Sequence, residues 1–184
     1  MNFFQKKIIT VIISFVFIGS SLSLLAQVTV QGQTAAAPEG SLHMPLEPLP
    51  EALAKLEESP VTLIGMTLQE LLVSFGIPVL VAAVRGAEPW QDDIVFTYTG
   101  GLSFYIYKNR VWKIKISAEY RKPFMGLLPG SPADIAVSLF GLPKMQDSQY
   151  AEWIIPFENW PMRLRILYDA NGKITTVFLY RADI

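Results

Sequence analysis

A short motif occurs twice in this chain. The first copy begins with Gly65-Met66-Thr67 and ends with Phe75-Gly76-Ile77-Pro78, and the second begins with Gly130-Ser131-Pro132 and ends with Phe140-Gly141-Leu142-Pro143. In each copy the two glycines are eleven positions apart (76 − 65 and 141 − 130), and the residues between them are mainly apolar. This duplication predicts that one supersecondary unit is built twice along the chain.

Both copies carry the signals of a short helix. In the first copy Thr67 and Glu70 fit a capping box, in which each side chain bonds a free backbone N–H at the start of the helix. Apolar residues follow at helical spacing, and Gly76 supplies the left-handed residue that often ends a helix. In the second copy Ser131 takes the cap position and Gly141 the end. We therefore predict one helix in each copy.

Three segments with strand-like alternation follow each helix. They are residues 93–98, 102–107 and 111–117 in the first half, and 153–157, 162–168 and 173–180 in the second. The alternation assigns Trp112, Ile114 and Ile116 to the inner face, and Lys113 and Lys115 to the outer face. The sequence thus predicts an α+β fold of two tandem repeats, each a short helix packed on an antiparallel β-sheet of about three strands. It leaves open whether the two sheets join.

The N-terminal residues have the composition of an export signal. Lys6 and Lys7 precede an uncharged apolar run over residues 8–18, and small residues follow. This pattern predicts a signal peptide over residues 1–26. The alternative is an uncleaved anchor, because residues 8–26 are about long enough to span a bilayer.

The residues between this segment and the first repeat are rich in proline and in small polar residues. We interpret residues 27–60 as a flexible, Pro-rich tether with at most one or two helical turns near its end. The first repeat then covers residues 61–122, and the second covers residues 123–184.

The chain has no cysteine, which excludes an acylated N-terminal cysteine, a disulfide framework and thiolate metal sites. Removal of Lys6 and Lys7 leaves 13 basic and 16 acidic residues, a net charge of −3. This balance is not that of a nucleic-acid-binding protein. We expect an exported protein, periplasmic or associated with the outer envelope, that is not a cysteine-acylated lipoprotein. Membrane contact is expected only if the N-terminal segment remains attached.

The pattern of glycines, prolines and aromatic residues resembles the BamE (SmpA/OmlA) family of outer-membrane lipoproteins. The residues that carry the resemblance are Gly65-Met66-Thr67, Gly76-Ile77-Pro78, Phe96-Thr97-Tyr98 and residues 104–116 in the first repeat, and Gly141-Leu142-Pro143, Trp153 and residues 165–174 in the second. A tandem of such units is also similar to the beta-lactamase inhibitor protein (BLIP-like) architecture. The missing cysteine departs from the BamE family, whose members are usually anchored through one.

Few residues suit catalysis. His43 is the only histidine and falls in the predicted tether, so the folded repeats offer none for a triad or a metal site. Asp92 and Asp93 are adjacent, but neighbours on a strand point to opposite faces, so we interpret them as a solvated strand entry. Gly100-Gly101 fits a hairpin turn. We expect no enzymatic activity, no cofactor and no metal.

The outer sheet face is the candidate binding site. It combines cationic and tyrosine side chains, namely Lys113, Lys115, Arg163, Arg165, Tyr105 and Tyr107. Arginine and tyrosine are enriched in protein interfaces, although cationic residues also solubilise an open sheet. The sequence favours a protein-binding or scaffolding module of the cell envelope that recognises another envelope protein, for example in outer-membrane or envelope assembly. The alternatives are an inhibitor of a secreted or periplasmic enzyme and a carrier of a small apolar ligand.

Overall fold

The computed structural model describes residues 45–85 and 93–184. The predicted signal peptide, most of the predicted tether with His43, and Asp92 lie outside the described residues. The helices are α1 (Pro50–Glu58), α2 (Leu68–Phe75) and α3 (Asp134–Phe140), with one 3₁₀ turn, η1 (Pro60–Leu63). None of the helices in this described part is long and apolar enough to cross a membrane.

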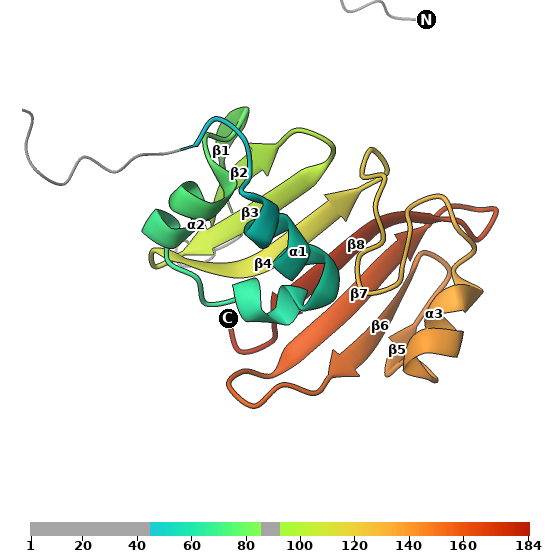
Figure 1. The fold of residues 1–184 in the computed structure, drawn as a ribbon. Coiled ribbons are helices and arrows are strands. Elements are labelled where there is room, and N and C mark those ends of the chain that lie inside the picture. Colours follow the sequence, from blue (N-terminus) through green and yellow to red (C-terminus); the bar gives the residue numbers. More distant parts are fainter. Residues whose placement is uncertain (1–44, 86–92) are drawn as a thin grey trace, which may run out of the picture. The chain divides into compact units, whose positions relative to one another are not determined.

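Eight antiparallel strands form a single sheet (Figure 1). In chain order they are β1 (Leu80–Val84), β2 (Asp93–Tyr98), β3 (Leu102–Tyr107), β4 (Arg110–Ser117), β5 (Met145–Gln146), β6 (Tyr150–Ile155), β7 (Met162–Tyr168) and β8 (Ile174–Arg181). Their order across the sheet is β1-β2-β3-β4-β8-β7-β6-β5. The first four strands and the last four therefore meet where β4 pairs with β8.

The three helices pack on one face of this sheet, and the core lies between them and the strands. One row of buried side chains crosses six strands in register: Phe96, Phe104, Ile114, Leu179, Leu164 and Trp153. Phe75 of α2 packs on this row, with its ring centroid 4.7 Å from that of Phe104. Because the row is continuous across β4 and β8, the two halves share one hydrophobic core.

The expectation of two tandem helix-on-three-strand repeats is wrong. Residues 45–85 and 93–184 form one continuous eight-stranded sheet with three helices. The sequence pattern missed β1 and β5 as strands, and alternation along a strand cannot reveal that β4 and β8 pair across a long separation. The resemblance to tandem BamE-like units and to the BLIP-like architecture is contradicted by this sheet.

Of the two predicted helix caps, the structure confirms the one at Thr67 and contradicts the one at Ser131. The capping box of α2 is present: the hydroxyl of Thr67 accepts from the N–H of Glu70, and the carboxylate of Glu70 accepts from the N–H of Thr67. Ser131, in contrast, does not cap α3, which begins after Ala133 without a side-chain cap. The hydroxyl of Ser131 instead donates to the carbonyl of Leu128, and its own carbonyl accepts from Ile174 of β8.

Trp112 does not face the core as the alternation predicted. The register between β3 and β4 shifts at a bulge, so that Tyr105 pairs with Lys113 while Ile106 pairs with Val111. Val111 thereby takes the buried position, at 0% exposure, and Trp112 moves to the other face. A bulge inserts one extra residue and reverses the alternation beyond it.

The end of the predicted tether belongs to the folded unit. Within residues 27–60, α1 forms a nine-residue helix that buries Ala52 and Leu56. The N–H of Leu49 also donates to the carbonyl of Ser74 at the end of α2, at 2.8 Å. These contacts tie the residues around α1 to α2.

Gly76 and Gly141 provide a matched test of this packing. Both end a helix at φ +76°, but a Cβ on Gly76 would lie 2.3 Å from the carbonyl oxygen of Pro45, whereas nothing lies within 4 Å of one on Gly141. We expect Gly141→Ala to lower the free energy of unfolding by about 1–3 kcal/mol, the cost of placing alanine at a positive φ with ψ −159°, a region that is essentially restricted to glycine. Gly76→Ala should cost clearly more in the same urea titration. Equal losses would contradict the packing of residues 45–49 on α2.

Candidate binding surface

The face of the sheet opposite the helices, hereafter the open face, carries polar and aromatic side chains in register. One row crosses the sheet through Val95, Tyr105, Lys113, Tyr180, Arg163 and Ile154, and the next through Thr97, Ser103, Lys115, Phe178, Arg165 and Glu152. No helix among the described residues covers this face. The open face thus combines four cations with tyrosine and phenylalanine rings.

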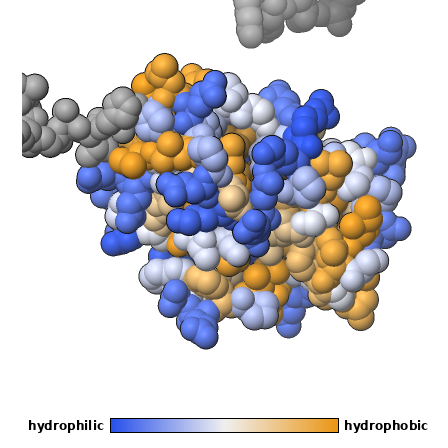
Figure 2. Space-filling model, in the orientation of Figure 1, coloured by the Kyte–Doolittle hydropathy of each residue, from blue (hydrophilic) through white to orange (hydrophobic). Residues whose placement is uncertain are grey.

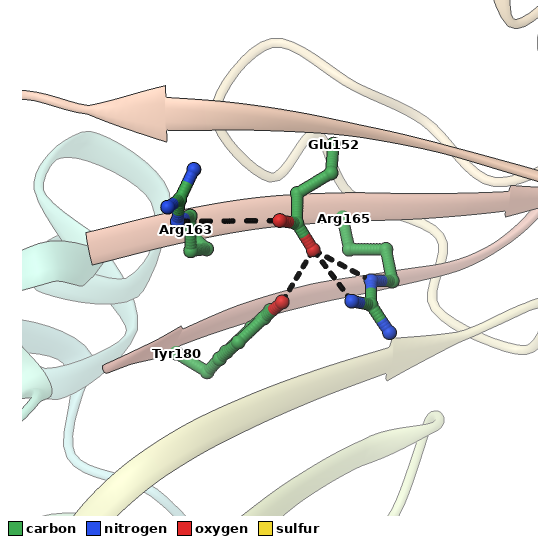
Figure 3. A network of polar contacts seen from close by, with 4 residues as sticks. All are labelled: Glu152, Arg163, Arg165 and Tyr180. Atoms are coloured by element: carbon green, nitrogen blue, oxygen red, sulfur yellow. Dashed lines mark hydrogen bonds and ion pairs between the residues drawn. The ribbon is translucent and has the colours of Figure 1, made fainter. Parts of the chain in front are cut away.

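Glu152 is the centre of a polar network on this face (Figure 3). It is only 4% exposed, although it is a carboxylate on β6. Arg165 donates to its Oε2 from Nε at 2.8 Å and forms an ion pair from Nη2 at 2.6 Å, and Tyr180 donates to the same oxygen. The Nε of Arg163 lies 4.0 Å from Oε1. One carboxylate therefore orients side chains from β7 and β8.

Asp93 of β2 has a similar role on the same open face, in the other half of the sheet. The indole N–H of Trp112 donates to Oδ1 of Asp93 at 2.8 Å, and the Nζ of Lys113 lies 3.7 Å from Oδ2. Asp93 is 7% exposed, so the expectation of a solvated strand entry is wrong for this residue. The bulge explains the difference, because it turns Trp112 toward the carboxylate.

A chain of cation–ring and ring–ring contacts crosses the open face from the side of Asp93 to the side of Glu152. The Nζ of Lys113 lies 3.8 Å from the ring centroid of Tyr105 and 4.2 Å from that of Trp112. The ring of Trp112 then meets that of Tyr180 edge to face, at 6.5 Å. The guanidinium carbon of Arg165 lies 5.6 Å from the ring centroid of Tyr180 and 4.8 Å from that of Tyr150. We call these six residues, which span β3 to β6 across the sheet, the cation–aromatic ladder.

Burial shifts the pKa values of two members of the ladder. Burial, together with the hydrogen bond to Glu152, raises the pKa of Tyr180 to about 12, so its hydroxyl remains a donor at neutral pH. Burial also lowers the pKa of Lys113 below its ordinary value, while the carboxylate of Asp93 acts in the opposite direction. Both shifts follow from the partial burial of these side chains on the open face.

The open face carries more cationic than anionic charge. The four cations Lys113, Lys115, Arg163 and Arg165 outnumber the carboxylates Asp93 and Glu152, which gives +2 (4 − 2). The Nη1 of Arg163 is buried and has no hydrogen-bond partner. The net positive charge can attract a carboxylate from a partner, and the half-exposed guanidinium of Arg165 can donate to it.

The structure brings most of the residues proposed from the sequence together. Tyr105 contacts Lys113, and Arg163 and Arg165 share Glu152. Lys115 lies between Ser103 and Phe178 in its row. Tyr107 lies farther out, at the β3–β4 turn, where it lines an open pocket of about 520 Å³.

Four residues that organise the open face were not identified from the sequence as part of the site. They are Asp93, Trp112, Glu152 and Tyr180. Glu152 alone had a usable signal, since it alternates with the apolar Ala151 and Trp153 in a strand. Its arginine partners depend on the register of β6 with β7, which the sequence does not show.

The acidic side chains of the open face are paired with cations. The part of the chain that the structure describes contains no group of three or more histidine, aspartate or glutamate side chains able to hold a metal ion. The two buried carboxylates, Asp93 and Glu152, are already engaged by cations. The arrangement is suited to holding charged and aromatic groups in place for binding.

A second concave feature lies beside α3, on the other face of the sheet. It has a volume of about 430 Å³ and is lined by Val137 of α3 and by Ala151, Trp153 and Ile166 of the sheet, among others. The indole N–H of Trp153 donates to the carbonyl of Gly141 at 2.9 Å, which orients the ring. The pocket combines these apolar side chains with polar ones, among them Asp134, Gln146 and Asn171.

Comparison with known proteins gives little further information. No protein-family model and no curated protein sequence matches the chain. A crystal structure of a cysteine-rich secretory protein from Staphylococcus aureus is similar over 74% of this chain and 49% of that chain, with 13% identity and a TM-score of 0.49. The chain thus spans about half the length of that protein. A similarity at this level carries no argument about function.

The role of Glu152 can be tested by unfolding. We expect Glu152→Gln to lower the free energy of unfolding by about 2–3 kcal/mol, because it leaves two arginines without their carboxylate. The loss should stay below that of a fully buried ion pair, since the side chain of Arg165 is 39% exposed. The control Glu158→Gln, at an exposed loop position, should change stability by less than about 0.5 kcal/mol. Indistinguishable effects of the two variants would refute the anchoring role.

Proposed function

We propose that this protein is an exported, non-enzymatic binding module of the cell envelope that recognises another protein through its open face. The observation that carries the proposal is the cation–aromatic ladder held between Asp93 and Glu152. Export rests on the signal-peptide pattern of residues 1–26. Scaffolding within the envelope is the form of binding that we favour.

The composition of the ladder supports binding. Tyrosine, tryptophan and arginine are the residues that most often dominate the free energy of protein interfaces. Here the buried carboxylates fix their side chains in the free protein, so less conformational entropy is lost when a partner binds. The cation–π contacts also keep the long side chains of Lys113 and Arg165 extended over rings.

The charge distribution indicates the chemistry of the partner. The open-face cluster carries +2, whereas the whole chain has a formal charge of −1, so the remaining residues sum to −3 (−1 − 2). An acidic partner would be attracted to the open face and repelled by the rest of the molecule. Such complementarity steers association and fixes orientation. We therefore expect the partner to present carboxylates.

The pocket beside α3 supports a second candidate function. Its volume of about 430 Å³ falls in the range of small-molecule sites, and its floor of Ala151, Trp153 and Ile166 is apolar. The protein would then carry a small apolar ligand. Such a ligand would bind on the helix side of the sheet, so a charge change at Lys115 should not affect it.

A pull-down with two matched variants tests the open face. Lys115→Glu reverses a charge on the open face, beside Phe178, without removing a cation that Glu152 engages, and Lys55→Glu makes the same change at an exposed position of α1. Residues 27–184 should capture a specific protein from solubilised envelope, and the affinity for that protein should fall about tenfold in Lys115→Glu. Lys55→Glu should bind like the wild type. Equal binding by both variants would exclude the open face as the site.

A further inference from the structure

The strand at one edge of the sheet, β1, is apolar and exposed on both faces. Its sequence is Leu80-Val81-Ala82-Ala83-Val84, and its three large side chains are between 45% and 57% exposed. The register with β2 places Leu80 and Val84 on the open face, and Val81 on the helix face. β1 pairs with β2 alone in the described part of the sheet, so its outer backbone groups lack a neighbouring strand there.

The two edges of the sheet differ in how they are protected. At the other edge β5 has only two residues, Met145–Gln146, and it is preceded by Pro143 and Lys144 and followed by Asp147. Short length, proline and charge are the features by which proteins block strand addition. β1 has similar flanks, with Pro78 two residues before it and Arg85 after it, but its five residues hold no charge, proline or bulge, so it is long enough to pair. The edge at β1 therefore has the properties of a template for another strand.

Further apolar side chains surround β1. Ile77, Val79 and Ile94 are between 47% and 64% exposed, and Figure 2 shows apolar atoms gathered at the end of the molecule where β1 lies. A partner that only covered one face would leave the opposite side of β1 exposed. A partner strand that continues the sheet covers the backbone groups and extends both faces.

We propose that β1 is a homodimer interface, in which β1 of two copies pair in antiparallel orientation about a two-fold axis at Ala82. The strand is complementary to itself in this register: Leu80 lies opposite Val84 of the second copy on the open face, and Val81 lies opposite Ala83 on the helix face. Large residues thus face medium or small ones, and no charges oppose each other. A contact in which the same patch is used by both copies is the usual form of a two-fold interface.

The sequence around β1 favours this register. Arg85 follows the strand, three residues after the central Ala82. In the dimer it would lie opposite Val79 of the second copy. The two arginines are thus kept away from the axis, where like charges would oppose each other. Pairing at this edge joins two sheets into one of sixteen strands (8 + 8), with the two open faces on the same side. The dimer would then be bivalent, which raises avidity for a partner with repeated sites.

Sedimentation velocity of residues 27–184 over a concentration series tests the dimer. The wild type should dimerise, and Ala82→Lys and Ala82→Glu should each raise the dissociation constant at least about 100-fold, because like charges meet at the axis. An equimolar mixture of the two variants should dimerise again, since the charges are then opposite. Gln146→Lys, at the β5 edge, is the control and should leave the dimer unchanged.

Several results would overturn the proposal. A wild type that stays monomeric throughout the series, or an Ala82→Lys variant that dimerises like the wild type, would do so. A monomer that begins to dimerise only after removal of residues 27–44 would show that this segment occupies β1 instead. If Ala82→Lys fails to fold, Leu80→Lys, at 57% exposure, provides the same test without opposing charges and should also weaken the dimer.

Discussion

Strands β4 and β8 pair in the middle of the sheet, and both faces of the molecule depend on this junction. On the helix side, the pairing of Ile114 with Leu179 continues the core from one half to the other. On the open face, the pairing of Lys113 with Tyr180 lets Trp112 meet Tyr180 edge to face. The ladder can only run from the Asp93 side to the Glu152 side because these strands are neighbours.

The two buried carboxylates give the open face its order. A surface ion pair contributes little to stability, because long side chains lose entropy when they are held in one geometry. Asp93 and Glu152 are almost fully buried, so their loss leaves cations without a partner in a partly dehydrated layer. The rings of Trp112 and Tyr180 restrict the same cations from the side. The open face is therefore held in one arrangement before any partner binds.

Local signals in the sequence predicted the elements that depend on local physics. The capping box at Thr67 and the alternation of residues 93–98, 102–107 and 162–168 correspond to α2, β2, β3 and β7. Features that depend on distant partners were missed. The bulge at Trp112, the pairing of β4 with β8 and the burial of Glu152 all follow from register, which is set by the whole sheet. The alternation in the sequence predicted that the cations share the open face, but it did not identify Asp93 and Glu152 as the carboxylates that position them.

The central claim is that Glu152 holds the open face in a fixed arrangement in the free protein. NMR relaxation of the Arg165 Nε–H group measures this directly. The account predicts an order parameter of about 0.8, close to that of rigid backbone, and a value below about 0.6 in Glu152→Gln. Arg121, which is exposed, serves as the internal reference for a mobile side chain. An Arg165 as mobile as Arg121 in the wild type would contradict the claim.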